Sequence, residues 1–419
     1  MPQGGVVRRA IETVVPARLG VPFRCLLGAS WASNLADGIS IAAGPLLVAS
    51  ESRDPFLVAL ALMLQRLPWL LFGLFAGVVA DRFDRRAIVI VVNVTRAAVI
   101  TTLAVAITLD SVTIAAILGA LFVLGTAETF ADTTSQTLLP MIVDKPDLSI
   151  GNARIMAGFV TIGTLVGPPV GAALFATGRV VPFVAEALCM VLSAALMSRM
   201  ALPAHGRDKA AGSHVRREIV EGLRWLWGHA AVRTLAITIV TFNVTFGAAW
   251  SVLVLYATER LGAGEVGFGL LTTATALGGV LGTGVYGWLS ARVSLGNLMR
   301  IGLILETLTH AALALTTALP IALGIMFVFG AHAFVWGTTS TTVRQRAVPT
   351  ELQGRVGSAY LIGVEAGIVV GSLSGGVVAG AFGVVAPFWF AFAGSAVLVV
   401  VLWRQLTQIA HADEAAPVL

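Results

Sequence analysis

Long apolar runs separated by short polar gaps dominate this chain of 419 residues. Most of the runs exceed 20 residues, the length that an α-helix needs to cross roughly 30 Å of hydrocarbon at about 1.5 Å per residue. They are rich in glycine and alanine and lack the apolar–polar alternation of membrane-barrel strands. Only 12% of the residues are charged, whereas a soluble domain has about 25%. The sequence therefore predicts an all-α integral membrane protein.

Twelve such spans can be placed, in two sets of six on either side of the long basic segment 203–231. The other connections are short, as is usual between antiparallel neighbours in a helix bundle. We therefore expect a six-helix bundle over 1–202, a cytoplasmic amphipathic linker over 203–231, and a second bundle with a short tail over 232–419. The expected spans are 23–49, 55–80, 87–109, 112–138, 154–176, 180–202, 232–257, 266–290, 299–319, 321–343, 356–381 and 384–406.

The positions of lysine and arginine predict the orientation in the membrane. With both termini in the cytoplasm, inner segments hold 22 of the 27 basic residues and outer loops hold three, while Arg66 and Arg96 lie within spans. This bias follows the positive-inside rule, so the net charge of +5 reports topology and not a nucleic-acid surface. We expect a multi-pass protein of a bacterial inner (plasma) membrane, surrounded by the lipid bilayer and without a nucleic-acid partner.

The linker contains the amphipathic stretch VRREIVEGLRWLWGHAAVRT at 215–234. Its apolar and charged residues separate onto different faces of a helix, a pattern that suits the inner membrane surface. This helix serves either as a tether between the bundles or as an element that binds a partner. The apolar residues at i, i+4 spacing are Val215, Ile219, Leu223 and Trp227.

The two sets of spans also resemble each other in sequence. The glycine run at 163–171 recurs 204 residues later at 367–375, and Thr133–Ser135 recurs at Thr338–Ser340 with an offset of 205. Matches at nearly one offset indicate a duplicated six-helix unit. Parallel repeats of this kind place a site near the midplane, between halves that move around it.

The ten residues GVVADRFDRR at 77–86 carry five charges between the second and third expected spans. They resemble motif A of the major facilitator superfamily, although Asp84 stands where the family has a glycine. The longer run QRLPWLLFGLFAGVVADRFDRR, with LLP at 138–140 and LQGRV at 352–356, is similar to the branch that contains bacterial macrolide-efflux proteins and the enterobactin exporter. The resemblance implies a fold of two pseudo-symmetric six-helix bundles. The matching residues of motif A are Gly77, Asp81, Arg82, Arg85 and Arg86.

Motif A is a cytoplasmic latch between the two bundles in this family, and the resemblance implies the same role here. Asp81 can approach the start of the span 356–381, near Gly354–Ser358, where unpaired backbone N–H groups carry partial positive charge. The arginines can pair with acids in neighbouring inner loops, and such contacts must break when the protein opens inward. In the alternative, the charges only fix topology, which explains the arginines but not two aspartates. The candidate acids are Asp144, Asp147 and Glu351.

The run GTLVGPPVGAAL at 163–174 resembles motif C, found in the fifth helix of exporters that act as antiporters. Its regularly spaced glycines let helices approach closely, and its two prolines bend the helix. By resemblance, the motif favours export over import. In the alternative, the glycines serve only in helix packing, because 367–375 has their spacing without the prolines. The residues concerned are Gly163, Gly167, Pro168, Pro169 and Gly171.

Ionisable residues within the spans are candidates for proton coupling, since an ionised side chain at mid-bilayer costs about 2.5–3.5 kcal/mol. The arginine that the family carries in its fourth helix is missing from 112–138, so coupling must be argued from acids. Glu128 and Asp132 stand one turn apart in this span, and two carboxylates in a desolvated site cannot both ionise cheaply. At least one of the two is therefore expected to bind a proton near neutral pH.

Asp37 in the first span is an equally good proton acceptor, and Arg66 can neutralise either Asp37 or Glu365 across the interface between the bundles. The third, sixth, ninth and twelfth helices of the superfamily are peripheral, so the resemblance assigns a structural role to the ionisable groups there. Of these, Glu306 and His310 stand at i and i+4 and can satisfy one another. The peripheral groups are Arg96, Glu186, Glu306 and His310.

The superfamily places its first, fourth, seventh and tenth helices around a central cavity, where polar and aromatic residues are candidates for substrate contact. Aromatic rings mixed with a few polar groups suit a bulky, partly apolar substrate, cations included. Ordinary packing is the alternative for aromatic residues at helical spacing. The candidates are Asn34, Asn243, Phe246, Trp250, His332 and Trp336.

Together these features predict a proton-coupled exporter of amphipathic small molecules, such as drugs or a secreted siderophore, that works by alternating access. The alternatives are an importer of the same fold and a receptor that binds without net flux. An enzyme would need a metal cluster or a nucleophile–base pair, whereas the six histidines are scattered and no HExxH, paired-cysteine or Walker sequence is present. We therefore expect no catalytic residue, metal or cofactor, and a monomer whose partners are the substrate and protons.

Overall fold

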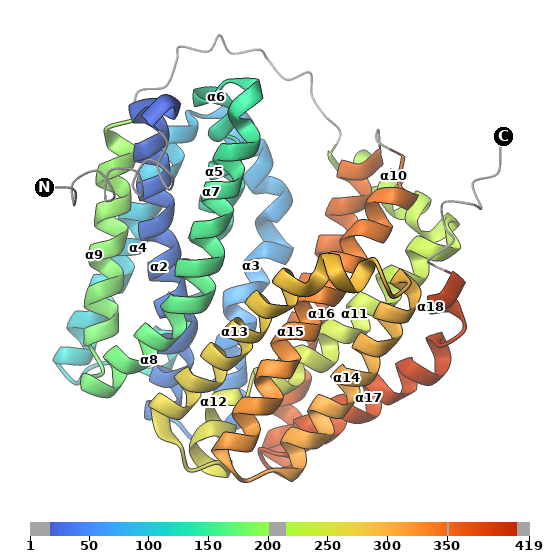
Figure 1. Cartoon of the computed structure of the whole chain (residues 1–419). Helices are drawn as coiled ribbons and strands as arrows, with labels where there is room; N and C mark the ends of the chain where they lie inside the picture. The colour runs from blue at the N-terminus through green and yellow to red at the C-terminus, as the bar shows by residue number, and fades with distance from the viewer. Residues whose placement is uncertain (1–16, 201–214, 350–351, 409–419) are drawn as a thin grey trace, which may run out of the picture. The chain divides into compact units, whose positions relative to one another are not determined.

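The computed structural model describes residues 17–200, 215–349 and 352–408. The regular structure of this part is entirely helical (Figure 1). Eleven of its helices are long and apolar enough to cross a membrane, and Ala386–Leu402 is a shorter apolar helix. The predicted all-α membrane architecture is thus confirmed.

The helices group into two compact units. Unit 1 comprises Met1–Gly44 and Leu71–Ala211. One of its membrane-length elements consists of two α-helices joined through a π-helical turn, η3. Its elements are η1 (Ala17–Leu19), most of α2 (Gly20–Glu51), the end of α3 (Pro55–Arg82), α4 (Arg85–Thr108), α5 (Ile114–Ser135), α6 (Leu139–Ile142), η2 (Lys145–Asp147), α7 (Leu148–Gly158), η3 (Phe159–Val166), α8 (Gly167–Thr177) and α9 (Val181–Ser198).

Unit 2 comprises Pro45–Leu70 and Gly212–Leu419. It holds the end of α2 and most of α3 together with the helices of the second expected bundle. Each of the twelve expected spans overlaps an observed element. The remaining elements are α10 (Val215–Gly228), α11 (Ala230–Trp250), α12 (Leu253–Leu255), η4 (Tyr256–Arg260), α13 (Gly264–Ser290), α14 (Leu295–Leu315), α15 (Leu319–Ala347), α16 (Gln353–Phe382), α17 (Ala386–Leu402) and α18 (Gln405–Gln408).

Side-chain caps begin two helices of unit 1. Asp84 accepts a hydrogen bond of 2.8 Å from the backbone N–H of Ala87 at the start of α4. Thr113 likewise accepts from the N–H of Ala116 at 3.2 Å and caps α5. Such caps satisfy first-turn N–H groups that have no partner within the helix. The departure from motif A at Asp84 therefore has a local structural use.

The repeated glycine runs bring helix backbones together in both units. A Cβ atom at Gly171 of α8 would lie 2.6 Å from the carbonyl oxygen of Ile39 in α2. In unit 2, a Cβ atom at Gly367 of α16 would lie 2.7 Å from the carbonyl oxygen of Val240 in α11. Both gaps are too short for a side chain, so the two runs perform the same small-residue packing.

A change of helix type precedes the two prolines of the motif C segment. The backbone N–H of Gly167 donates to the carbonyl oxygen of Ile162, five residues back, at the end of η3. Pro168 and Pro169 then occupy the first turn of α8, where a missing N–H costs least. The sequence predicts a bend here, and the structure shows a π-helical turn directly before the prolines.

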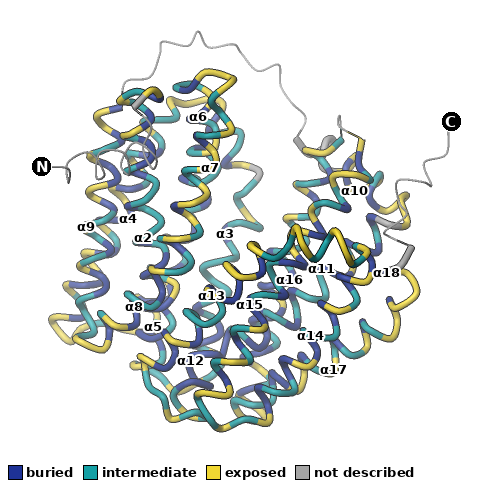
Figure 2. Tube along the Cα trace, viewed as in Figure 1, coloured by how far each residue is buried: buried dark blue, intermediate teal, exposed yellow. Residues whose placement is uncertain are grey.

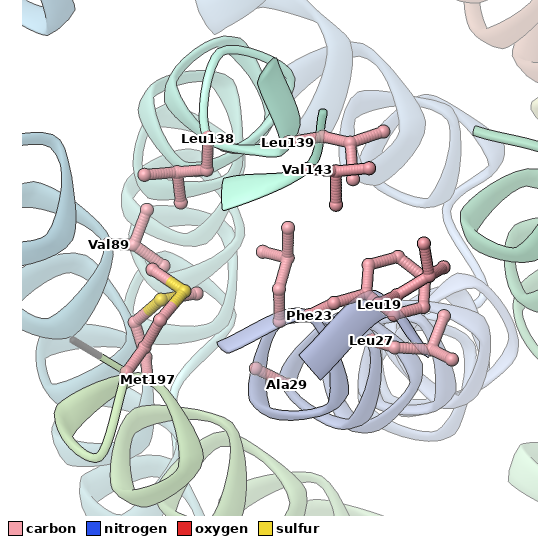
Figure 3. Close-up of a cluster of buried hydrophobic side chains, with 11 residues drawn as sticks. Leu19, Phe23, Leu27, Ala29, Val89, Leu138, Leu139, Val143 and Met197 are labelled. Carbon is pink, nitrogen blue, oxygen red and sulfur yellow. The ribbon is translucent and has the colours of Figure 1, made fainter. Parts of the chain in front are cut away.

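An apolar cluster joins α2, α4, α9 and the segment around α6 within unit 1 (Figure 3). Phe23 of α2 is fully buried, and Leu139 is almost fully buried. Val89 of α4 and Met197 of α9 complete the contact between these segments. Burying each large side chain contributes about 1.5–3 kcal/mol relative to leaving it exposed, so this cluster fixes the helices that surround the cavity described below.

Apolar side chains also cover outward faces of the same helices. Figure 2 shows exposed positions along α4 and α9, and among them Val91, Val94, Leu188 and Leu192 are each more than half exposed. Soluble proteins rarely expose contiguous apolar surface on this scale. These faces therefore suit contact with lipid chains.

The amphipathic helix α10 is packed onto α16 within unit 2. A Cβ atom at Gly222 would lie 2.6 Å from the carbonyl oxygen of Arg355, and Glu221 forms an ion pair of 3.0 Å with the Arg355 guanidinium. Leu226 is buried, whereas Trp227 is about half exposed. This arrangement favours the tether over the partner-binding alternative. Residues 201–214 and the side chains of Val215 and Ile219 lie outside the described part.

Candidate functional site

Unit 1 encloses a cavity of about 910 Å³ between α2, α4, α5, α7 and α9. Its wall is rich in hydroxyl and amide groups, and Asp132 of α5 is the acid among the residues that line it. Of the predicted substrate contacts, Asn34 lies in this wall. The polar lining residues are Ser30, Ser33, Asn34, Asn93, Asp132, Ser135, Gln136, Ser149, Asn152 and Ser193.

Hydrogen bonds hold the polar wall across three helices. The Asn93 amide of α4 donates to the Ser193 hydroxyl of α9 at 3.0 Å. Ser193 in turn donates to the carbonyl oxygen of Ala29 in α2 at 2.9 Å. Because buried polar groups are costly unless they are paired, this chain keeps the cavity polar without loosening the bundle.

A buried ion pair lies beside the cavity. The Arg96 guanidinium of α4 donates to the carboxylate of Asp37 in α2, and the exposed fractions of the two side chains are 2% and 18%. The Ser33 hydroxyl donates to the other Asp37 oxygen at 3.4 Å and accepts from Arg96 at 3.5 Å. Since Ser33 also lines the cavity, one hydroxyl connects the cavity wall with the ion pair.

Two further carboxyl groups act on the same guanidinium. Glu128 of α5 and Glu186 of α9 both interact electrostatically with Arg96. Glu186 is almost fully buried, lies close to the Ser40 hydroxyl, and has an oxygen, Oε1, without a hydrogen-bond partner. Asp37, Glu128 and Glu186 therefore share Arg96 as their cation. We call these four residues the Arg96 cluster.

This arrangement differs from two expectations drawn from the sequence. Arg96 and Glu186 are expected to be peripheral and structural, yet they interact with Asp37. Arg66 is one of two expected partners of Asp37, but the observed partner is Arg96. The signal was present, since a buried guanidinium inside a span needs a carboxylate within reach. Which helix faces would meet could not be deduced from spacing alone.

Arg66 acts instead on the other candidate, Glu365. Both residues belong to unit 2, with Arg66 on α3 and Glu365 on α16, and the Arg66 charge acts on the Glu365 carboxyl. Glu365 is 8% exposed, and its Oε2 atom has no hydrogen-bond partner. The second of the two alternatives thus describes the arginine.

The acids of α5 serve different surroundings. Asp132 lines the cavity, whereas Glu128 contributes to the electrostatic field at Arg96. Their spacing of one turn is as expected, but the structure associates one with the open volume and the other with the ion pair.

Aromatic side chains of α11 and α15 stack within unit 2. Trp250 lies 4.6 Å from Phe246 and 4.5 Å from Phe329, measured between ring centroids. Trp336 is 3% exposed and stacks on Phe242 at 5.6 Å. For Trp336, ordinary packing is the alternative that fits.

Asn243 of α11 is also committed within its unit. Its amide donates to the carbonyl oxygen of Ile239 at 2.7 Å, and the side chain is 6% exposed. A Cβ atom at Gly367 would come within 2.8 Å of it. Packing explains this residue as well.

An acid and two imidazoles meet behind the aromatic stack. His310 Nε2 lies 2.9 Å from Glu306 Oε1 on the same helix, so the expected i, i+4 contact is observed. His332 of α15, expected as a substrate contact, places Nε2 3.3 Å from the other Glu306 oxygen. The sequence missed this meeting of α14 and α15.

The motif A loop makes its observed contacts inside unit 1. Arg85 pairs with Asp81 at 3.4 Å and donates to the carbonyl oxygen of Ala80 at 3.2 Å. Arg86 donates to the carbonyl oxygens of Met197 and Ser198 at the end of α9. These arginines therefore also bind backbone, which the search for acidic partners did not foresee.

The expected acidic partners of this loop are used differently. Asp147 pairs with Arg18 at 3.1 Å, and Glu351 lies outside the described residues. The approach of Asp81 to Gly354–Ser358 and the roles of Gly77 and Arg82 in a latch remain predictions.

The sequence matches the profile of one protein family along nearly its whole length. This family, described as transmembrane secretion effector, matches residues 11–418. The chain is 28% identical over 351 residues to the multidrug efflux pump Tap of Mycolicibacterium fortuitum, an alignment that covers 80% of this chain and 83% of Tap.

The fold is similar to those of solved transporters. The nucleoside transporter NupG aligns with a TM-score of 0.75 at 11% identity, covering 93% of this chain and 99% of NupG. A bacterial homologue of the iron transporter ferroportin, in an inward-facing state, aligns with a TM-score of 0.73 at 14% identity, covering 93% and 98%. At these identities the likeness establishes the fold alone.

Proposed function

Because this chain belongs to the transmembrane secretion effector family of major facilitator transporters, we propose that it exports amphipathic small molecules, drugs or a secreted metabolite, in exchange for protons. The observation that carries the proposal is the Arg96 cluster beside a polar cavity. The name of the relative Tap, a multidrug efflux pump, supports the direction of transport, as does the resemblance of 163–174 to motif C.

The proton-binding part of the proposal follows from charge. Asp37, Glu128 and Glu186 share one guanidinium, so full ionisation would leave two negative charges uncompensated. Carboxylates that share a desolvated site cannot all ionise cheaply. The cluster therefore holds at least one exchangeable proton.

Proton binding also changes the partner of Arg96. When Asp37 is ionised, it is the carboxylate that accepts a hydrogen bond from Arg96. Protonation of Asp37 weakens this pair and leaves Arg96 to Glu128 and Glu186 on two other helices. Such an exchange of partners couples proton uptake to helix movement, since packed interfaces switch between discrete arrangements.

The cavity provides the substrate-binding part. Its volume of about 910 Å³ lies within the range of about 300–1,000 Å³ that is typical of small-molecule sites. Asp132 places a carboxyl group in the wall and can attract either a cationic group of the substrate or a proton. Ser33 transmits the occupancy of the cavity to Asp37 through its hydroxyl.

The remaining assignments complete the transport cycle. The two repeats alternate access to the site, with the motif A residues Gly77, Asp81, Arg82, Arg85 and Arg86 as the cytoplasmic latch. We place both termini in the cytoplasm of a bacterial cell, from the distribution of arginine and lysine. Transport requires neither a cofactor nor a second copy of the chain.

Dye efflux from bacterial cells tests the proposal. Cells that express the protein should lose a preloaded cationic fluorescent dye faster than empty-vector cells, and a protonophore should abolish the difference. Efflux that persists after the proton gradient collapses would refute the coupling. Asp110→Asn is a suitable control, because it neutralises an exposed acid outside the spans whose positive φ of 49° asparagine also tolerates.

The importer alternative is tested by vesicle orientation. Inside-out vesicles with an inwardly directed proton gradient should accumulate substrate, because their outer face corresponds to the cytoplasm. Accumulation only by right-side-out vesicles would favour import.

A further inference from the structure

The Glu306, His310 and His332 side chains form a buried ionisable cluster in unit 2, outside the Arg96 cluster and the cavity. Glu306 and His310 are fully buried, and His332 is 6% exposed. The carboxylate lies between the imidazoles, 2.9 Å from His310 Nε2 and 3.3 Å from His332 Nε2. One acid thus faces two groups that change charge between about pH 5 and pH 8.

The cluster is incompletely hydrogen-bonded. Nδ1 of His310, both ring nitrogens of His332 and Oε2 of Glu306 have no hydrogen-bond partner of good geometry. The contact between His332 and Glu306 is therefore electrostatic. Buried polar groups are usually satisfied, and each exception calls for an explanation. A site that must gain and lose a proton is such an explanation, because its hydrogen bonds differ between the two states.

The surrounding helices supply little other charge to Glu306. The imidazoles are the charged groups that act on it. From the packed helices, α17 carries no titratable residue, and the arginines of α15, Arg344 and Arg346, stand three or more turns from His332. On α14 itself, Arg300 binds the carbonyl oxygen of Trp403. Proton occupancy therefore sets the charge of the cluster.

Aromatic rings separate the cluster from the rest of α11. Trp250 meets the His310 ring edge to face at 6.4 Å, and Phe329 meets the His332 ring in the same way at 5.3 Å. Both aromatic residues belong to the stack that contains Phe246. A shift of this stack changes the surroundings of both imidazoles, which links the packing of α11 to the cluster.

We propose that Glu306, His310 and His332 form a second proton-binding site, which takes up and releases one proton in each transport cycle. The proposal rests on the proposed proton-coupled transport and adds a proton carrier in the second repeat. It contrasts with the structural role that the sequence assigns to Glu306 and His310. A purely structural cluster would instead keep one fixed protonation state.

A titration of the purified protein in detergent tests proton binding without requiring transport. Protons bound between about pH 9 and pH 5 are compared for the wild type and for His310→Gln with His332→Gln. We expect the wild type to bind about one proton more per chain over this range. Glu306→Gln should shift the midpoint of the remaining uptake to lower pH, because the imidazolium loses its counter-ion.

Matched controls separate titration from misfolding. Thr307→Val changes a partly buried residue of α14, whose hydroxyl donates to Leu303, without removing a titratable group. It should leave the proton count unchanged. Each variant is used only if it elutes as the wild type does in size-exclusion chromatography, and His332→Gln alone serves if the double variant fails this check.

Proteoliposomes then link the site to transport. The number of protons moved per substrate, obtained from the proton gradient that just balances a substrate gradient, should be one lower in the histidine variants. A flat titration difference, or an unchanged proton number, would overturn the proposal. If wild-type transport ignores the proton gradient, the proposed function fails, while the detergent titration still reports whether the cluster binds a proton.

Discussion

Removal of Arg96 should destabilise the protein more than any other single change in the Arg96 cluster. The Arg96 side chain is 2% exposed and pairs with Asp37, which is 18% exposed. Removing one partner of a buried pair costs about 3–5 kcal/mol, because the other charge is left uncompensated. Arg96→Gln leaves three carboxyl groups without their cation, so we expect a loss in this range.

The partner substitution should cost less. In Asp37→Asn the guanidinium keeps Glu128 and Glu186 as neighbours, and the asparagine oxygen can still accept a hydrogen bond. The expected loss is therefore about 1–3 kcal/mol, the value of a hydrogen bond to a charged group. In the double variant the two losses should fall short of their sum by about 1–3 kcal/mol, the usual coupling of contacting residues.

Equilibrium unfolding in mixed micelles, with SDS as denaturant and circular dichroism as the readout, gives these free energies. Thr95→Val is the matched control on α4, since Thr95 is exposed and its hydroxyl binds only the Val91 carbonyl oxygen. It should change stability by less than about 0.5 kcal/mol. Strictly additive losses, or a loss for Arg96→Gln no larger than the control, would refute the assigned pairing.

Three further predictions concern the fold. Gly171→Val should lower the free energy of unfolding by about 1–3 kcal/mol because its side chain would meet backbone of α2, whereas Gly119→Ala, which has open space, should not; the SDS titration compares them. Asp84→Ala should cost about 0.5–2 kcal/mol through loss of the α4 cap, and serine there should restore most of it; equal stability of the two variants would contradict the cap. Glu221→Gln should change stability by no more than about 1 kcal/mol, since the pair is largely exposed, while Gly222→Leu should displace α10 and speed tryptic cleavage at its arginines; equal cleavage rates would argue against the packing of α10 on α16.

The sequence was sufficient for the membrane architecture because hydropathy and arginine placement are local properties. A run such as 87–109 crosses a bilayer whatever its neighbours are, and α4 (Arg85–Thr108) coincides with it closely. The cap at Asp84 was equally accessible, since an aspartate directly before a helix is a common start signal. The glycine repeat predicted close packing, and both copies show it.

The pairing of ionisable groups was not accessible in the same way. It depends on how each helix is rotated about its axis and on depth, and a long arginine side chain spans several ångströms. Asp37 was therefore assigned to Arg66 as readily as to Glu365, and Arg96 was set aside with the peripheral helices. The meeting of His332 with Glu306 likewise requires the packing of α15 on α14. Backbone acceptors, such as those that bind Arg86, leave no trace in the sequence.

The most direct test of the central claim is gradient-driven transport by a variant without charge in the Arg96 cluster. Neutral residues at Asp37, Arg96, Glu128 and Glu186 together leave no uncompensated charge, so folding should survive. In proteoliposomes this variant should still exchange substrate for substrate, a process that needs no net proton movement. It should fail to accumulate substrate against a gradient when a pH difference is imposed. Accumulation at the wild-type level would contradict the account.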